Sequence, residues 1–270
     1  MGSIRRIGVS GDAFVAALSR SPGRRRSRWW ATLFALLMLT MSCSATVDGA
    51  ARPAANLAAR FLDGQTLNRV LLGESALSRM VKEPLEIDPR FPPLFGGPEM
   101  LPGDTGWPGD CLGVAVMMQG AAYRSANVKG VALKTWRPAA VPAATVAGVD
   151  EAAISLPTTA DANALFATFS RQWHECDGKT VPIVGGTLPL EVKVSDVQSA
   201  TSVVAATIST EWSAPGFVSS SVPAARGIGV RDNCLVEVEV DFVNSPGASQ
   251  EGSSALDIAQ VMRDKVSALS

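Results

Sequence analysis

Residues 233–243, NCLVEVEVDFV, alternate between two faces with a period of two. One face carries apolar side chains and the other mostly carboxylates: Cys234, Val236, Val238, Val240 and Phe242 against Leu235, Glu237, Glu239 and Asp241. This alternation is typical of an antiparallel strand with one buried face and one face in water. Further strands are predicted at 131–138, 149–157, 188–197 and 201–212, and 225–230 is expected to lead into the last strand.

Helical periodicity is clearest in residues 158–176, TTADANALFATFSRQWHEC. Thr158 or Thr159 is expected to cap this helix, with Asp161 in its first turn. Its apolar stripe consists of Ala162, Leu165, Phe166, Phe169, Trp173 and Cys176. A second helix is predicted at 253–270, capped by Ser253 or Ser254, with Leu256, Ala259, Val261 or Met262, and Val266 turned inward.

Two shorter helical segments precede the strands. Residues 64–81 place leucines and Val70 at helical spacing, with Gly73 as a stop signal, and 111–123 predict a short helix. The order of helices, consecutive strands and a final helix indicates the α+β class. We therefore expect an antiparallel or mixed sheet with helices packed on one face, as a two-layer sandwich.

Residues 84–110 contain seven prolines and five glycines, which excludes regular structure over most of the segment. Their aromatic and large apolar side chains argue against disorder. We expect an ordered loop, and two hypotheses remain: the loop covers part of the core, or it forms the roof of a cleft.

The first 42 residues hold seven of the 24 basic side chains and one of the 25 acidic ones. Residues 29–41 are mainly apolar but fall short of the roughly 20 needed to span a bilayer. The pattern predicts an export signal of the lipoprotein type at 1–42, with Cys43 lipidated by a palmitate-type chain. An ordinary secretory signal, cleaved near Ala45 or Ala50, is the alternative. Residues 43–59 are then a flexible tether, and 60–270 form the domain.

The net charge of the chain after residue 42 restricts the partners that it is expected to bind. From residue 43 onward the chain has 17 basic and 24 acidic residues, a net charge near −7. An acidic exported domain is poorly suited to nucleic acid or to anionic membrane surfaces. We therefore do not expect the protein to bind nucleic acid.

Catalytic and metal-binding motifs are missing from the sequence. It has no GxxxxGK[ST], GxGxxG, GxSxG or HExxH pattern, and His174 is its one histidine. Residues 174–177, HECD, are consecutive, so a helix would point them in different directions and they could not converge on a metal. We expect no cofactor and no metal, and we interpret His174 as a surface residue.

Four cysteines are present, and with Cys43 assigned to lipid three remain in an oxidising compartment. Three pairings are open on sequence alone. Cys111 follows a Pro-Gly loop and Cys176 ends a helix, whereas Cys234 lies on the buried face of a strand and can serve as a small hydrophobe. We favour the Cys111–Cys176 pairing.

Several segments together resemble the PknH-like extracellular sensor domain of mycobacteria. They are DCLG at 110–113, YRSA at Tyr123, the helix that ends in Trp173-x-x-Cys176, and ARGIGVRDNCLVEVEV with Arg226 and Asn233. The resemblance spans roughly 60–270. It implies a sheet packed with helices and a cleft for a ligand. Domains of this family occur as the outer domain of a Ser/Thr kinase or as free-standing lipoproteins, and the free-standing form is expected for this chain. A second cysteine pair of the family has no counterpart near 224–226, which implies that Cys234 is unpaired.

We therefore expect a non-enzymatic, extracytoplasmic sensor-type domain, lipid-anchored on the outer face of the cell envelope. Its partner would be a lipid or glycan of the envelope, or an envelope protein. Large or charged side chains near the predicted loop and sheet edges are the candidates for the cleft: Trp107, Tyr123, Trp136 and Arg226. Two alternatives are an envelope hydrolase that uses His174 with Glu175 or Asp177, and a structural or chaperoning lipoprotein without a small ligand.

Overall fold

The structure is a computed structural model, and it describes residues 62–101, 111–140, 144–183, 190–212, 220–243 and 248–270. The predicted signal, the tether, Cys43 and Trp107 lie outside these ranges. No helix in the described ranges is long and apolar enough to cross a membrane.

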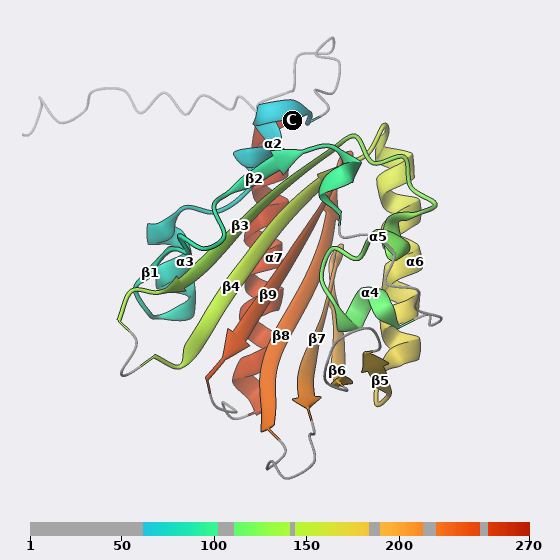
Figure 1. The fold of residues 1–270 in the computed structure, drawn as a ribbon. Helices are drawn as coiled ribbons and strands as arrows, with labels where there is room; N and C mark the ends of the chain where they lie inside the picture. The colour runs from blue at the N-terminus through green and yellow to red at the C-terminus, as the bar shows by residue number, and fades with distance from the viewer. Residues whose placement is uncertain (1–61, 102–110, 141–143, 184–189, 213–219, 244–247) are drawn as a thin grey trace, which may run out of the picture. The chain divides into compact units, whose positions relative to one another are not determined.

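The described residues form one antiparallel sheet of nine strands, with the order β1-β3-β4-β9-β8-β7-β6-β5 and β2 paired with β3 (Figure 1). The strands are β1 Leu85–Ile87, β2 Leu94–Gly96, β3 Gly130–Pro138, β4 Val146–Ser155, β5 Thr180–Ile183, β6 Leu190–Ala200, β7 Val203–Trp212, β8 Ser220–Arg231 and β9 Cys234–Phe242. The predicted antiparallel sheet and the α+β class are confirmed. β8 is a full strand rather than a short lead into β9.

The helices follow the predicted positions, with shorter segments in 64–81 and 111–123. The last helix is longer than predicted: it begins at Ala248, so the predicted cap at Ser253 or Ser254 is wrong. The helices are α2 Gly64–Asn68, α3 Glu74–Val81, the 3-10 helix η1 Pro98–Met100, α4 Leu112–Ala115, α5 Gly120–Tyr123, α6 Thr159–Cys176 and α7 Ala248–Leu269. Gly73 is the N-cap of α3, so it separates two helices as predicted. The Thr158 hydroxyl caps α6 by accepting the backbone N–H of Asp161 at 3.1 Å.

Helices cover both faces of the sheet, so the predicted two-layer sandwich with helices on one face is wrong (Figure 1). The α7 helix packs on β7, β8 and β9 on one face, which also carries α2 and α3. The α4 and α6 helices pack on the other face. That second face bears Glu237 of β9, whose carboxylate suggested a face in water; it is buried because a cation is buried beside it.

The α7 helix lies unusually close to the sheet because β8 offers it a glycine. A Cβ atom at Gly227 would stand 2.8 Å from the backbone oxygen of Ala255. On α7, Ala259, Met262 and Val266 are buried as predicted, whereas Val261 is 42% exposed. Of the two neighbouring positions left open by the sequence, Met262 is therefore the inward one.

The proline- and glycine-rich segment holds more regular structure than its composition predicts. β1 and β2 both pair with β3, as Leu85–Ile87 with 136–138 and Leu94–Gly96 with 131–133. Prolines are tolerated here because they lie outside the short paired stretches, at the edge of the sheet. The expectation for 84–110 is corrected for these residues, and 102–110 lie outside the described ranges.

Candidate functional site

A buried guanidinium organises the sheet face beneath α4 and α6. Arg226 of β8 is fully buried, and its Nη2 lies 2.6 Å from Oε2 of Glu237 on the neighbouring strand β9. Its Nη1 donates to the backbone oxygens of Gly113 and Val114, at 3.1 and 2.8 Å, in α4. Arg226 therefore links two strands to the helix above them.

Glu237 accepts further donors from the α4–α5 region. The Tyr123 hydroxyl donates to its Oε1, and the backbone N–H of Met118 donates to its Oε2 at 3.2 Å. Burial raises the pKa of Tyr123 well above its usual value, and the nearby Glu237 charge adds to the rise, so the phenol stays protonated and donates. The Tyr123 ring packs on Phe169 of α6, with centroids 5.2 Å apart. This network holds the helical layer on the sheet.

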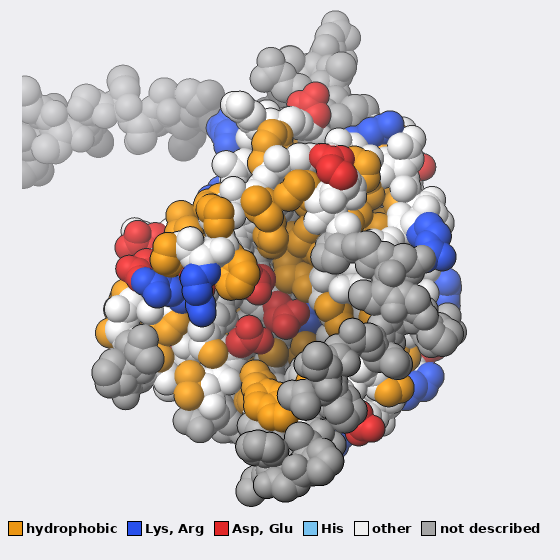
Figure 2. All heavy atoms as spheres, in the orientation of Figure 1, with side chains coloured by type: hydrophobic (Ala, Val, Ile, Leu, Met, Phe, Trp, Pro, Cys, Tyr) orange, Lys and Arg blue, Asp and Glu red, His pale blue; other side chains and the backbone are white. Residues whose placement is uncertain are grey.

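Beside this network the same sheet face carries three further carboxylates, which we call the acidic hollow: Asp150, Glu239 and Asp241. Asp150 of β4 lies directly opposite Glu239 of β9, and Asp241 follows two residues later on the same face. All three are half-buried. Figure 2 shows acidic side chains gathered in a recess of the surface, with apolar side chains around it.

The carboxylates of the acidic hollow are held in conditions that disfavour their charge. Burial raises the pKa of Glu239 to about 8 and that of Asp241 to about 6, and the neighbouring Asp150 charge adds to both rises. Burial also raises the pKa of Asp150, although Thr135 Oγ1 donates to its Oδ1 at 2.5 Å. Arg226 lowers the pKa of Glu239 through its Nε, 3.2 Å from Oε2, but it is shared with Glu237. The hollow therefore holds more carboxyl groups than the one guanidinium can balance, and each of the three binds its proton more tightly than an exposed carboxyl does.

The arrangement offers hydrogen-bond acceptors to a ligand. Across the described residues no group of three His, Cys, Asp or Glu side chains is placed to hold a metal ion. A carboxylate has two oxygens and several acceptor sites, so half-buried carboxylates that already have one partner can still accept hydrogen bonds from hydroxyl or ammonium groups of a ligand. Such groups would favour the charged carboxylates and relieve their repulsion.

On the opposite face, Glu151 forms a separate buried contact. Its Oε1 accepts the backbone N–H of Leu72 at 2.9 Å, and its Oε2 accepts Nε1 of Trp136 at 2.8 Å. Burial raises the pKa of Glu151 to about 7. Lys265 of α7 donates to the backbone oxygen of Leu71 at 2.5 Å, so this contact fixes the junction between α2 and α3.

The predicted cleft residues do not all lie together. Tyr123 and Arg226 meet at Glu237, beneath α4 and α5. Trp136 is buried on the other face of the sheet, and Trp107 lies outside the described residues. The side chains of Tyr123, Trp136 and Arg226 are each at most 3% exposed, and a role for them in binding stays a prediction.

The sequence also contained the residues of the acidic hollow, without marking them as a site. Glu237, Glu239 and Asp241 share one strand face, and by itself this density of carboxylates predicts a face in water. The signal that could have distinguished them is Arg226, the charged residue in the otherwise small and apolar run 222–230. A guanidinium in a buried strand must be paired with an anion, and the neighbouring strand is where a carboxylate can reach it.

His174 is exposed on α6, as predicted, and its Nε2 lies 2.7 Å from Oγ of Ser199 on β6. The Oε1 atom of Glu175 lies 4.0 Å from Nε of Arg171, one turn away on the same helix. In the described part of the chain no carboxylate hydrogen-bonds to His174, so the third member of a catalytic triad is missing there.

Cys111 and Cys176 form the predicted disulfide, which joins the start of α4 to the end of α6. Cys234 is free and buried, also as predicted. Burial raises the pKa of its thiol to about 12, so it remains a neutral, apolar-like side chain.

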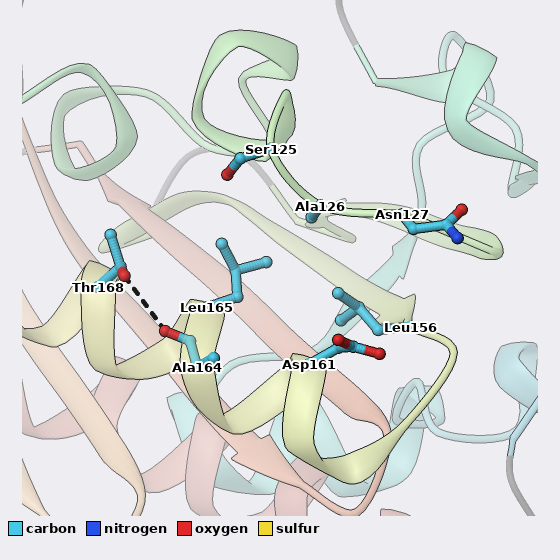
Figure 3. Close-up of a pocket in the computed structure, with 8 residues that line it drawn as sticks. All are labelled: Ser125, Ala126, Asn127, Leu156, Asp161, Ala164, Leu165 and Thr168. Carbon is cyan, nitrogen blue, oxygen red and sulfur yellow. Dashed lines mark hydrogen bonds between the residues drawn. The ribbon is translucent and has the colours of Figure 1, made fainter.

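A separate groove of about 280 Å³ runs between α6 and the residues that follow α5 (Figure 3). Figure 3 shows Leu165 and Asp161 on α6 facing Ser125 and Asn127, and Thr168 Oγ1 donates to the Ala164 oxygen at 3.2 Å. None of the residues predicted to bind a ligand lines this groove.

Comparisons with known proteins agree on one family. A model of the PknH-like extracellular domain matches residues 62–265. Among solved structures, the extracellular domain of PknH from Mycobacterium tuberculosis matches with a TM-score of 0.62 at 19% sequence identity, over 77% of this chain and 98% of that one. At this identity the match establishes the shared fold. A search of curated proteins found no match.

Proposed function

Because this chain belongs to the PknH-like extracellular domain family, it carries an extracytoplasmic domain of the sensor type, and we propose that this domain binds a ligand in the acidic hollow without catalysing a reaction. The ligand would be an envelope lipid head group or glycan that offers hydroxyl or ammonium groups. The same surface could bind such groups on an envelope protein.

The observation that carries the proposal is the surplus of carboxylates beside Arg226. Glu237 already balances the guanidinium at 2.6 Å, yet Asp150, Glu239 and Asp241 share the same face. Their repulsion and burial destabilise the unbound domain, as the raised pKa values of all three indicate. Side chains that reduce stability in this way are typical of binding sites.

We also propose that the domain is held at the outer face of the cell membrane by a lipid on Cys43. Support comes from the sequence pattern around Cys43 and from the extracellular nature of the family. The tether at 43–59 would leave the domain free to meet ligands of the envelope.

Native mass spectrometry of the chain, purified from its own envelope in mild detergent, tests the binding proposal. We expect a bound species with the wild type, and at least tenfold less of it with the Asp150→Asn, Glu239→Gln, Asp241→Asn triple variant. A matched control is Glu191→Gln, Glu211→Gln, Asp257→Asn, which neutralises three exposed carboxylates elsewhere. A wild type without a bound species would contradict the proposal and favour a structural or chaperoning role.

One contact favours a second candidate, an envelope hydrolase. His174 Nε2 and Ser199 Oγ are within hydrogen-bond distance, as a base and a nucleophile require. The test is hydrolysis of p-nitrophenyl acetate by the wild type and by His174→Ala. Equal rates would exclude the candidate, and a loss of more than tenfold with an intact fold would support it.

A further inference from the structure

Large hydrophobic side chains are exposed mainly at one edge of the sheet. Among the described residues six such side chains are exposed, and four of them lie between positions 87 and 95. We call these four the apolar edge: Ile87, Phe91, Leu94 and Phe95, which are 41%, 57%, 43% and 44% exposed. They belong to β1, β2 and the turn between them, along the outer side of β3 (Figure 1). β1 and β2 pair with opposite ends of β3, and the neighbours Leu94 and Phe95 lie on opposite faces of β2, so the four side chains follow the edge rather than one face. Such a concentration marks a contact surface more often than scattered single residues do.

The turn that carries Phe91 is held in place by a buried carboxylate. Asp88 is 2% exposed, and its carboxylate accepts the backbone N–H of Arg90 at 2.9 Å. The Nε and Nη2 atoms of the Arg90 side chain donate to the same carboxylate at 3.0 and 2.6 Å. The backbone N–H of Phe91 in turn donates to the backbone oxygen of Asp88 at 3.0 Å. The Phe91 ring is therefore displayed on a preorganised turn.

The same contacts remove net charge from the turn. Asp88 balances Arg90, and the Arg90 guanidinium lies 5.7 Å from the centroid of the Phe91 ring. The apolar edge thus presents an aromatic ring beside a neutralised ion pair. A surface of this kind suits an apolar environment and does not depend on anionic groups in its partner.

The β2 part of the apolar edge lies near the point where the preceding chain joins the domain. Asn233 clamps Leu62, accepting its N–H at 3.0 Å and donating to its oxygen at 3.2 Å. The α2 helix, which follows at once, packs on β2, β3 and β4. Residues 44–61 therefore connect Cys43 to the end of the domain at which Leu62 meets Asn233, and fully extended they would reach at most about 65 Å.

We propose that the apolar edge inserts into the lipid surface to which the chain is tethered. The inference rests on the membrane anchoring proposed above. The short tether keeps the domain at a high effective concentration near the bilayer, so the four apolar side chains can insert although the domain is acidic overall. Insertion at this edge would orient the domain relative to the membrane.

The test uses the chain as processed in its own envelope, reconstituted into phosphatidylcholine vesicles with or without brominated acyl chains. Phe91→Trp places a fluorophore on the apolar edge, and Val261→Trp on α7 is the control, because Val261 is similarly exposed at 42%. Difference spectra against the wild type remove the signal of the native tryptophans. Co-sedimentation with the vesicles measures anchoring separately.

We expect brominated lipid to quench the Phe91→Trp signal at least twofold and to leave the Val261→Trp signal unchanged. Equal quenching at both positions, or none at Phe91→Trp, would overturn the proposal. Co-sedimentation of the same samples with the vesicles would then still support the anchoring of the chain. Protection of Phe91→Trp from aqueous iodide in the intact envelope, but not in vesicles, would also overturn it and assign the edge to an envelope protein.

Discussion

Arg226 is the residue on which the covered face of the sheet depends most. Its guanidinium bonds two backbone oxygens of α4 and pairs with Glu237, while Tyr123 and Met118 donate to the same carboxylate. A buried ion pair adds little stability over an apolar pair of the same shape, but breaking it leaves an uncompensated charge.

Replacing Arg226 by methionine should therefore lower the free energy of unfolding by about 3–5 kcal/mol, because Glu237 would remain buried without its partner. The double variant Arg226→Met, Glu237→Gln should lose less than the sum of the two single changes. Urea denaturation measures both. Arg231→Met, at an exposed residue, serves as the control; if Arg226→Met were as mild as this control, the buried pair would not organise the face.

The acidic hollow sets a pH dependence whose sign follows from the raised pKa values. Glu239 has a pKa of about 8, above its ordinary 4.5, so the folded protein binds this proton more tightly than the unfolded chain does. The stability that this group contributes is complete below pH 4.5 and is lost as pH rises through about 8.

Thermal unfolding followed from pH 5 to pH 9 should therefore show a falling midpoint for the wild type, and a flatter profile for Glu239→Gln. The Glu211→Gln variant, exposed on β7, should keep the wild-type slope. A midpoint for Glu239→Gln that falls as steeply as that of the wild type would show that Glu239 is not held in a charge-disfavouring site.

At the scale of elements, the disulfide fixes the short α4 helix to the long α6 helix. Cys111 and Cys176 are 65 positions apart. Closing a loop of this length stabilises by about 4 kcal/mol in the chain-entropy model. The double variant Cys111→Ser, Cys176→Ser should have a free energy of unfolding lower by up to that amount. Its amide hydrogen exchange should accelerate most in residues 111–123. Uniform exchange across the domain would argue against a local role for the bond.

The contact between α7 and β8 depends on the missing side chain at Gly227. Gly227→Ala would place a methyl group 2.8 Å from the Ala255 oxygen, so the helix must shift, at about 1–3 kcal/mol of stability. Gly73→Ala meets nothing within 4 Å and should change stability by less than about 1 kcal/mol. Urea denaturation compares the two, and equal effects would mean that the close approach is not required.

At the scale of the whole molecule, local patterns predicted the elements and failed on their layering. The alternation of β9, the cap and stripe of α6, and the positions of Cys111 and Cys176 are local features, and the structure confirms them. Alternation cannot tell a face in water from a face whose charges are paired and covered. That distinction depends on Arg226, which meets Glu237 only after β8 and β9 have paired.

Apart from the signal that Arg226 gives, the sequence does not show that the carboxylates of the acidic hollow lie together. Asp150 lies on β4 and Glu239 on β9, and the sheet makes these strands neighbours although they are far apart in the chain. Side-chain size and charge, used to select Trp107, Tyr123, Trp136 and Arg226, identified buried packing groups as readily as surface ones. Pairing between distant strands must be known before such a site can be predicted.

Carboxyl footprinting tests the binding proposal most directly, because it needs no knowledge of the ligand. Glycine ethyl ester labelling would be compared between the chain in its own envelope and the purified chain, with the exposed Glu191 and Glu211 as internal controls. The account predicts that Asp150 and Asp241 are labelled at least threefold less in the envelope, while the two controls are labelled equally in both states. Equal labelling of all four carboxylates in both states would contradict a ligand in the acidic hollow.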